Sequence, residues 1–249
     1  MSIYAILQQD KKVVVNDLAE KFGVTKMTIR RALSFFEKQG IVKTTYGGAY
    51  LTRGASVEPG FQLQSIQMAD DKHLIGQKAA EQVEDGDTII IDCGTTPLAL
   101  AHFIFDKKIM VITNSIPVVN LLKGRKNIKL IVAPGEYEDA SQGMVSFSTA
   151  DFFRHIHADK VFLSTQGVND LGELTVPEMT DAHVKQALMR AGRQKILLAD
   201  SSKFGQTFLA GHARLADLDL VISQTGLSPD ILSLMQTQNV PLLLADSHL

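Results

Sequence analysis

The stretch VTKMTIRRALSFFEKQGIVKTTYGG, residues 24–48, decides how the first part of this chain folds. Thr25 can cap a helix, because its hydroxyl oxygen can accept a hydrogen bond from a backbone N–H that has no partner inside the helix. Ile29, Leu33 and Phe36 follow at helical spacing. This spacing predicts one apolar face on a helix that begins just after the cap.

The same stretch carries basic and polar side chains away from that apolar face. Gly40 suits the position after a helix C-terminus, and the segment IVKTTY followed by Gly47-Gly48 predicts a hairpin with a glycine turn. A helix that is basic near its start can place those residues in the major groove of DNA, while the hairpin contacts the backbone or the minor groove. We expect DNA contacts from Lys26, Met27, Thr28, Arg30, Arg31, Lys43, Thr45 and Tyr46.

Two shorter helices are predicted upstream, over residues 2–9 and 17–22. A short β segment lies between them, Asn16 is the expected cap of the second, and Gly23 makes the turn to the third helix. Helix, helix, glycine-containing turn and helix is the order of a helix-turn-helix domain. We therefore expect a winged helix-turn-helix at the N-terminus.

The charge distribution favours DNA binding over the alternative that these Lys and Arg are merely solvated. Residues 1–53 hold nine Lys and Arg against four Asp and Glu, a net charge of +5. The rest of the chain holds 16 against 23, a net charge of −7. A basic unit joined to an acidic one is the expected pattern for a protein that binds phosphates with one end only.

The remaining residues read as an α/β domain. Buried apolar strands such as TIIID, residues 88–92, alternate with amphipathic helices, which predicts a mostly parallel sheet. We expect a DNA-binding domain over residues 1–53, a linker over residues 54–70 and a second domain over residues 71–249. The length of 249 residues accommodates this division.

Polar residues follow five of the predicted strands. The carboxyl ends of parallel strands meet at one edge of a sheet, and this edge is where ligands bind in such folds. Glycine lets the backbone approach a ligand, and the N–H groups at a helix start, where Pro97 suits the first position, favour an anion. Taken alone, each segment could be a helix cap or a surface turn. The segments are Asp92 to Thr96, Thr113 to Ser115, Pro134-Gly135, Thr165 to Gly167 and Asp200 to Gly205.

Composition predicts the compartment and argues against several kinds of site. Cys93 is the single cysteine, which excludes an intrachain disulfide and suits a reducing cytoplasm. No apolar run is long enough for a membrane span, and the N-terminus has no signal-peptide pattern. Cys93 has no general base nearby in sequence, and His155 and His157 do not share a helix face. We expect no catalytic residues, no metal site and no cofactor.

The chain resembles the DeoR family of bacterial transcription regulators over essentially its whole length. Members are mostly repressors of sugar or nucleoside catabolic operons that a phosphorylated sugar or a related metabolite releases. Their second domain resembles the fold of ribose-5-phosphate isomerase and CoA-transferase. The matching segments are Val24 to Ala49, DGDTIIIDCGTT (Asp85 to Thr96), ITNS (Ile112 to Ser115) and LADSSKFG (Leu198 to Gly205).

The resemblance also implies the effector site. The phosphate loop would be formed by Asp92, Gly94, Thr95 and Thr96. The rest of the site would be formed by Asn114, Gly135, Gly167, Glu178, Lys185, Asp200 and Lys203.

Several positions depart from the family pattern. Ala32 follows the paired arginines where the family commonly has Asp, and Pro134-Gly135 replaces a Gly-Gly pair. Residues 164–167 read STQG where the family usually has Gly-Ala-Asp-Gly, so that Gln166 supplies an amide in place of a carboxylate. These changes predict an effector that differs from the commonest ones. The first helix also begins close to Met1, which shortens the basic lead found in relatives.

The sequence therefore predicts a repressor that binds double-stranded operator DNA as a dimer or tetramer and responds to a phosphorylated sugar. An activator with the same architecture is one alternative, because the same contacts would serve it. A sugar-phosphate isomerase-like enzyme with a DNA-binding head is another, in which Asp92, Glu178 and Lys185 would have to act on a carbonyl compound.

Overall fold

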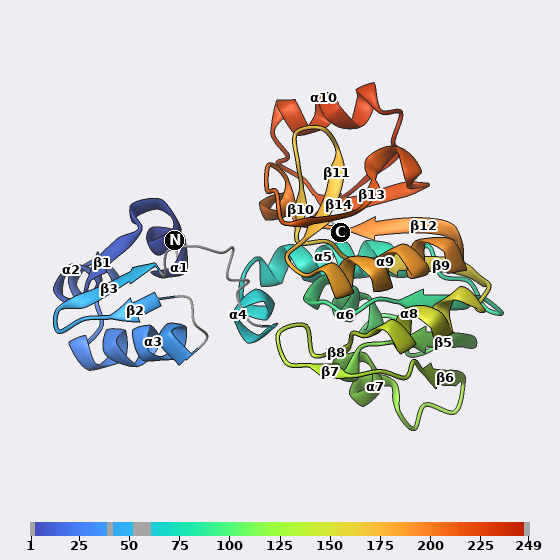
Figure 1. Cartoon of the computed structure of the whole chain (residues 1–249), viewed down its shortest axis with the longest axis horizontal. Helices are drawn as coiled ribbons and strands as arrows, with labels where there is room; N and C mark the ends of the chain where they lie inside the picture. The colour runs from blue at the N-terminus through green and yellow to red at the C-terminus, as the bar shows by residue number, and fades with distance from the viewer. Residues whose placement is uncertain (1–2, 39–41, 52–60, 247–249) are drawn as a thin grey trace. The chain divides into compact units, whose positions relative to one another are not determined.

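The structure is a computed structural model of the chain, and it describes residues 3–38, 42–51 and 61–246. The chain separates into two compact units, Met1–Gly60 and Phe61–Leu249 (Figure 1). No helix among the described residues is long and apolar enough to cross a membrane.

Within its described residues, the first unit combines three helices with a small antiparallel sheet. The helices are α1 (Ile3–Asp10), α2 (Val15–Phe22) and α3 (Lys26–Lys38), and the strands are β1 (Lys12–Val14), β2 (Val42–Thr44) and β3 (Gly48–Leu51) in the order β1-β3-β2. Ile29, Leu33 and Phe36 are buried as their spacing predicts. The helices α2 and α3 with the hairpin β2–β3 form the expected winged helix-turn-helix.

Local contacts explain how these elements begin and end. Thr25 caps α3, since its Oγ1 accepts a hydrogen bond of 3.2 Å from the backbone N–H of Thr28. Gly23 ends α2 in the left-handed conformation, with φ at 63°. The predicted cap at Asn16 is wrong, because α2 begins one residue earlier and its N-cap, Val14, makes no side-chain bond. The predicted helix end at Gly40 lies outside the described residues.

The hairpin has the expected glycine turn, and the second of its glycines is required by packing. The Thr45 N–H donates to the Gly48 carbonyl at 2.9 Å. A Cβ atom on Gly48 would lie 2.0 Å from the Val13 carbonyl oxygen, because β1 pairs with β3 at this point. Only glycine allows the two backbones to approach so closely.

The second unit contains a seven-stranded sheet in which every pair of neighbours is parallel. The order is β15-β14-β12-β9-β4-β5-β6. These strands are β4 (Thr88–Ile91), β5 (Ile109–Thr113), β6 (Ile128–Val132), β9 (Ala158–Leu163), β12 (Gly192–Leu198), β14 (Leu220–Gln224) and β15 (Leu242–Ala245). The predicted parallel α/β architecture is confirmed.

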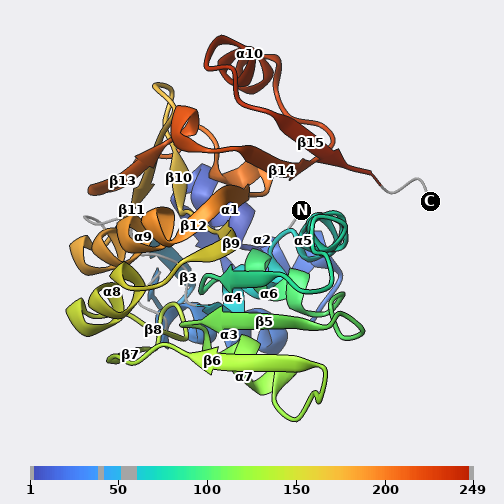
Figure 2. The same cartoon turned by 90° about the vertical axis from the view of Figure 1, so that its right-hand side faces the viewer.

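Helices cover both faces of this sheet (Figure 2). Successive strand residues point to opposite faces, so Ile89 and Ile91 pack in one core and Ile90 in the other. The first core is shared with α5 (Ala69–Ala80), α6 (Thr95–Ala101) and α7 (Ile116–Leu122). The second core is shared with α8 (Phe147–Arg154), α9 (Met179–Ala191) and α10 (Pro229–Thr237).

Several elements were not predicted from the sequence. An antiparallel sheet of β10 (Gly167–Val168), β11 (Glu173–Val176) and β13 (Ala210–Arg214) stands beside the parallel sheet (Figure 1). A short hairpin joins β7 (Tyr137–Glu138) to β8 (Gly143–Met144), and two 3-10 turns span Ser201–Lys203 and Leu215–Asp217. Helix α4 (Phe61–Ile66) and the start of α5 fall inside the expected linker, and both belong to the second unit.

Candidate functional site

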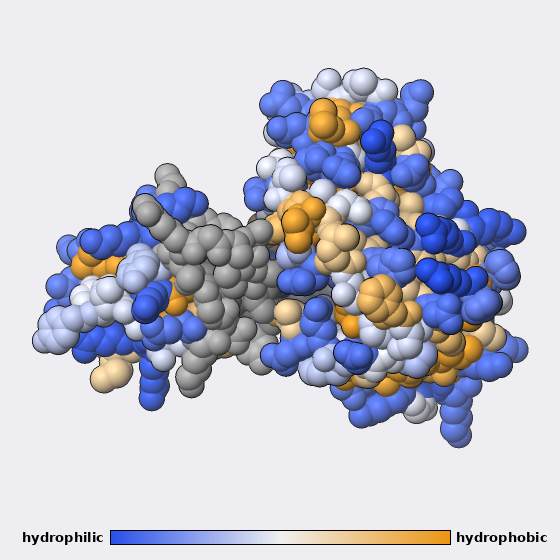
Figure 3. All heavy atoms as spheres, viewed as in Figure 1, coloured by the Kyte–Doolittle hydropathy of each residue, from blue (hydrophilic) through white to orange (hydrophobic). Residues whose placement is uncertain are grey.

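The first candidate site is the surface formed by α3 and the β2–β3 hairpin. Lys26, Thr28, Arg30 and Arg31 are exposed on the helix, and Lys43 and Thr45 are exposed on the hairpin. Met27 is 63% exposed and Tyr46, at the hairpin turn, is fully exposed. The eight predicted side chains therefore face solvent, as contact with DNA requires. Hydrophilic residues cover much of the visible face of this unit (Figure 3).

A contact that the sequence reading missed fixes the hairpin to α3. Glu37 on the helix accepts two hydrogen bonds from Thr44 on β2, one from the backbone N–H at 2.7 Å and one from Oγ1 at 2.6 Å. These hydrogen bonds, the side-chain one first, lower the pKa of Glu37. Glu37 and Thr44 are both visible in the sequence as polar residues next to predicted elements. Their contact could not be predicted, because they lie on different elements and no helix or strand period connects them.

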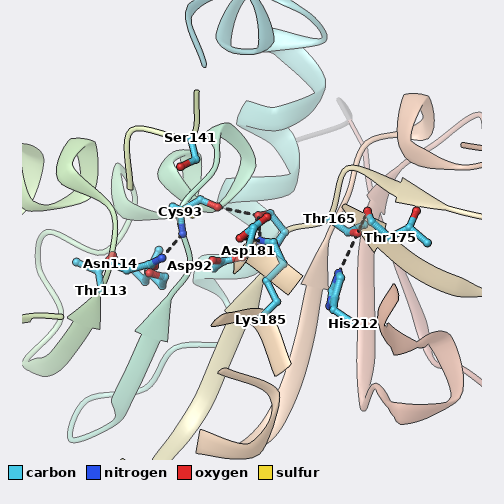
Figure 4. Close-up of polar contacts among 12 residues, drawn as sticks. Asp92, Cys93, Thr113, Asn114, Ser141, Thr165, Thr175, Asp181, Lys185 and His212 are labelled. Carbon is cyan, nitrogen blue, oxygen red and sulfur yellow. Dashed lines mark hydrogen bonds and ion pairs between the residues drawn. The ribbon is translucent and has the colours of Figure 1, made fainter. Parts of the chain in front are cut away.

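The second candidate site lies where the parallel strands end. Asp92, directly after β4, is fully buried, and its Oδ2 lies 2.6 Å from the Lys185 ammonium on α9. The same oxygen accepts a hydrogen bond of 2.9 Å from the backbone N–H of Ser164, which follows β9. The structure thus brings together two predicted residues that are 93 positions apart in the sequence. Figure 4 shows Asp92, Asp181 and Lys185 converging at this point.

The buried lysine carries its charge because of its acidic neighbours. Burial alone would lower the pKa of Lys185, but the carboxylates of Asp181 and Asp92 outweigh burial and raise it. Asp92 Oδ1 is buried and has no hydrogen-bond partner among the described residues. Asp92 and Lys185 therefore form an enclosed ion pair. A ligand would contact the loops around the pair before it could contact the pair itself.

Cys93 is part of the packing around this pair. Its backbone N–H donates to Asn114 Oδ1 at 3.1 Å, which joins the ends of β4 and β5 (Figure 4). Burial raises the pKa of the Cys93 thiol well above its usual range, and the Asp92 carboxylate adds to that effect. A thiol that stays protonated is a poor nucleophile. The chemistry of Cys93 therefore agrees with a packing role.

The predicted phosphate loop begins α6. Gly94 is the N-cap, with φ at 137°, and a Cβ atom there would lie 2.8 Å from Ser164 Oγ. Helix α6 begins at Thr95 and not at Pro97, so the expectation of proline at the first helical position is wrong. Thr95 and Thr96 are both buried, and their backbone N–H groups belong to the first turn, whose donors lack partners within the helix.

The other predicted residues occupy neighbouring loops. Gly135, with φ at 151°, lies against the side chains of Thr149 and Ser146. Gly167 is the first residue of β10 and lies against the backbone of Gln206. Glu178 is exposed at the N-cap of α9 and makes no side-chain cap bond.

A second cluster of charges follows β12. Asp200 is buried and Lys203 is partly buried, and Lys203 Nζ donates to Gln166 Oε1 at 3.3 Å. Asp200 Oδ2 lies 3.9 Å from Nζ of Lys72, a buried lysine on α5 that the sequence reading did not single out. Burial lowers the pKa of Lys72 to about 8, and Asp200 opposes the shift.

Two pockets adjoin these loops. One, of about 420 Å³, lies between the β10 region and α10 and is lined in part by Phe204 and Gly205. The other, of about 210 Å³, is lined in part by Lys72 and Thr95. No group of three or more His, Cys, Asp or Glu that could hold a metal ion occurs in the described part of the chain.

A buried histidine beside this region was also missed. The Thr165 hydroxyl has two carbonyl acceptors within reach, those of Gly167 and Thr175, each 3.1 Å from Oγ1. Thr165 Oγ1 also lies 3.1 Å from His212 Nε2 (Figure 4). Because the single Thr165 hydroxyl proton goes to a carbonyl, its oxygen accepts from the histidine. Burial, with a smaller effect of the Lys185 charge, lowers the pKa of His212 to about 3. His212 is therefore neutral.

Comparisons with known proteins cover both units. Residues 1–53 match the family described as DeoR-like helix-turn-helix domain, and residues 67–225 match the family described as DeoR C terminal sensor domain.

Two curated relatives are similar over nearly the whole chain. The glycerol-3-phosphate regulon repressor of Escherichia coli (strain K12) is 29% identical over 99% of this chain and 94% of the relative. The lactose phosphotransferase system repressor of Staphylococcus epidermidis (strain ATCC 35984) is 29% identical over 89% of both chains. Among solved structures, ribose 5 phosphate isomerase A from Neisseria gonorrhoeae is similar with a TM-score of 0.37 and 19% identity, over 53% of this chain and 52% of that chain.

Proposed function

Because this chain belongs to the DeoR family of transcription regulators, we propose that it is a repressor that binds operator DNA and is released by a phosphorylated sugar-type effector. The observation that carries the proposal is the exposed basic surface of α3, with Arg30 and Arg31, next to a hairpin whose turn carries the exposed Tyr46. This surface has the shape of a recognition helix and a wing. The two relatives named above are repressors of a glycerol-3-phosphate regulon and of a lactose phosphotransferase system.

The two sites have separate roles in this proposal. Lys26, Met27, Thr28, Arg30 and Arg31 enter the major groove, and Lys43, Thr45 and Tyr46 contact the backbone or the minor groove. The effector binds at the strand ends of the domain that follows the linker. There the first turn of α6 and the lysine of the Ser201–Lys203 turn supply donors for a phosphate, and the Asp92–Lys185 pair holds the surrounding loops. The residues of this site are Asp92, Gly94, Thr95, Thr96, Asn114, Gly135, Gly167, Glu178, Lys185, Asp200 and Lys203.

The effector half of the proposal is tested by thermal unfolding of the full chain with a panel of sugar phosphates and the corresponding free sugars. A ligand that binds only the folded state raises the melting temperature. We expect a rise with at least one phosphorylated sugar and none with its unphosphorylated form. If no phosphorylated compound in the panel raises the melting temperature, the effector class is wrong.

The DNA half is tested separately, by selecting bound fragments of the source genome with the full chain and titrating the selected duplex. We expect specific binding that the active sugar phosphate weakens. Strengthened binding, or a binding site upstream of a promoter, would favour the activator.

We propose that the chain has no catalytic activity. Abstraction of a proton next to a carbonyl needs a carboxylate that can reach the substrate. Asp92 is enclosed and paired with Lys185, which leaves Glu178 as the one exposed carboxylate of the candidate set, and Gln166 offers an amide where a second acid would be needed. Incubation with ribose 5-phosphate should therefore yield no ketose.

The protein is proposed to act as a symmetric dimer or tetramer in the bacterial cytoplasm, where operator DNA is found. A single recognition helix makes too few contacts for operator-grade affinity. Apolar residues are visible on the second unit (Figure 3), and Phe147, Met179 and Leu209 are among its exposed large hydrophobic residues. Such residues commonly mark contacts between subunits.

A further inference from the structure

Lys72 holds the C-terminal end of helix α4. Its ammonium donates to the backbone carbonyl of Gln64, and to that of Gln67 at 2.8 Å. The last carbonyls of a helix lack partners within it, and a lysine ammonium is a suitable donor for them. In the chain, α4 is the first described element after the residues that connect to the DNA-binding unit.

The same ammonium faces the proposed effector site. Asp200 Oδ2, at the end of β12, lies 3.9 Å away and has no hydrogen-bond partner among the described residues. The other oxygen of Asp200 accepts from the Ser202 backbone N–H at 3.0 Å, in the turn that carries Lys203. Lys72 and Lys203 are also close enough to repel, since Lys203 contributes to the lowered pKa of Lys72. One buried charge therefore contacts both α4 and the turn after β12.

The joint between α4 and α5 is strained. Met68, directly before α5, has φ at 51°, in the left-handed region that residues with a Cβ atom rarely adopt. The Lys72 backbone N–H donates to the Met68 carbonyl at 2.9 Å, so the lysine holds this joint through its backbone and its side chain. Strained joints of this kind persist only while their surroundings enforce them. A pocket of about 210 Å³ beside Lys72 leaves room for movement.

The other end of α4 also connects to the proposed effector site. The Phe61 N–H donates to the Ala140 carbonyl at 3.1 Å, in the turn between β7 and β8. The β8 strand of that hairpin is fixed to the end of β5, because the Met144 N–H donates to the Asn114 carbonyl at 2.7 Å. Helix α4 is thus held at both ends by segments that contact proposed effector-binding residues.

We propose that Lys72 is a positioning residue that couples occupancy of the Asp200–Lys203 turn to the placement of α4. An anion bound at the turn would attract the Lys72 ammonium away from the Gln64 and Gln67 carbonyls. Release of those carbonyls would free the Met68 joint and let α4 move. The effector part of this inference rests on the proposed function, whereas the hold of Lys72 on α4 does not.

The hold is tested without ligand, by hydrogen exchange and mass spectrometry of residues 61–68 in the full-length protein. We expect Lys72→Met to speed exchange there by at least about tenfold, the effect of losing one charge-assisted hydrogen bond, because the ammonium donates to both the Gln64 and the Gln67 carbonyl. Lys78→Met on the same helix is the control and should leave it unchanged, because Lys78 pairs with Glu81 at the surface. Exchange at the wild-type rate in Lys72→Met would overturn the inference. If Lys72→Met fails to fold, Lys72→Gln, which removes the ammonium and shortens the side chain, carries the test.

The coupling is tested with glycerol 3-phosphate, the smallest phosphomonoester of a sugar alcohol. We expect it to raise the melting temperature of wild type and of Lys72→Met, but to change exchange of residues 61–68 only in wild type. A change in both proteins would show that the signal bypasses Lys72 and would overturn the coupling. If the melting temperature of wild type does not rise, the proposed effector class fails for this probe. The ligand-free experiment still decides whether Lys72 holds α4.

Discussion

At the scale of the residue, burial gives Asp92 and Lys185 a role different from that of exposed charges. The two side chains are 0% and 3% exposed and lie 2.6 Å apart. A buried ion pair gains little over an apolar pair, but removal of one partner leaves a charge without compensation. The pair therefore holds the ends of β4 and β9 and helix α9 in one arrangement.

Replacement of Lys185 by Met should destabilise the protein strongly. The Asp92 carboxylate would remain buried without its cation, at a cost of about 3–5 kcal/mol in the free energy of unfolding. Urea unfolding of the full chain measures this change, and Lys123→Met, at an exposed lysine, is the control. The double variant with Asp92→Asn should recover part of the loss. A single-variant loss below about 1 kcal/mol would contradict an uncompensated buried charge.

His212 gives the protein a pH-dependent stability. Its pKa is about 3 in the folded chain against an ordinary value of 6.5, because burial disfavours the imidazolium and the Lys185 charge adds to the effect. The unfolded chain therefore takes up a proton first as the pH falls. The stabilisation is present above pH 6.5 and is lost as the pH falls toward 3.

The measurement is the free energy of unfolding between pH 7 and pH 4 for wild type and His212→Gln. Wild type should lose more stability over this range than the variant does. His157→Gln, at an exposed histidine, serves as the control and should follow wild type. Parallel curves for wild type and His212→Gln would refute the assignment of a neutral buried histidine.

At the scale of the element, helix α3 separates its packing face from its basic face. Replacement of Arg31 by Ala removes an exposed charge and leaves the buried Ile29 and Leu33 in place. If Arg31 grips a phosphate, the slope of log affinity against log salt should fall by about 1 for any duplex. If it reads a base, the loss should be about 1–3 kcal/mol and confined to the selected duplex.

Fluorescence anisotropy titrations of labelled duplexes at several salt concentrations distinguish these outcomes. Lys123→Ala, in the unit that carries the effector site, is the matched control and should bind DNA as wild type does. Unchanged affinity and unchanged slope in Arg31→Ala would exclude this arginine from the interface.

The elements that the sequence predicts well are those with a strong local period or a buried run. The apolar face of α3 and the strand β4 fall where the helical spacing and the buried run TIIID indicate. The antiparallel strands β10, β11 and β13 were missed, because isolated segments of two to five residues carry no clear period. The site residues at strand ends follow from the parallel sheet, since such a sheet collects those ends at one edge. Lys72, Glu37 and His212 could not be found this way, because each acts through a partner on another element.

At the scale of the whole molecule, we expect the chain to form an oligomer in which the helix-turn-helix units are paired. Sedimentation of the full-length protein at micromolar concentration should give a dimer or tetramer and no monomer, since isologous symmetry matches a palindromic operator. Sedimentation in the presence of the selected duplex should give a complex with an even number of chains. A monomer that binds this duplex with nanomolar affinity would contradict the paired arrangement.

The strand order of the second unit also determines when its sheet can form during synthesis of the chain. Its central pair, β4 with β9, joins residues about 70 positions apart, and β9 ends at Leu163. The described strands of the first unit end at Leu51, and they pair within that unit. Chains emerge from the ribosome N-terminus first, and domains fold as units. The helix-turn-helix can therefore form before β4 pairs with β9, because more than a hundred residues separate the end of β3 from the end of β9. A nascent chain can therefore reach nearby DNA before it has any means of sensing a metabolite.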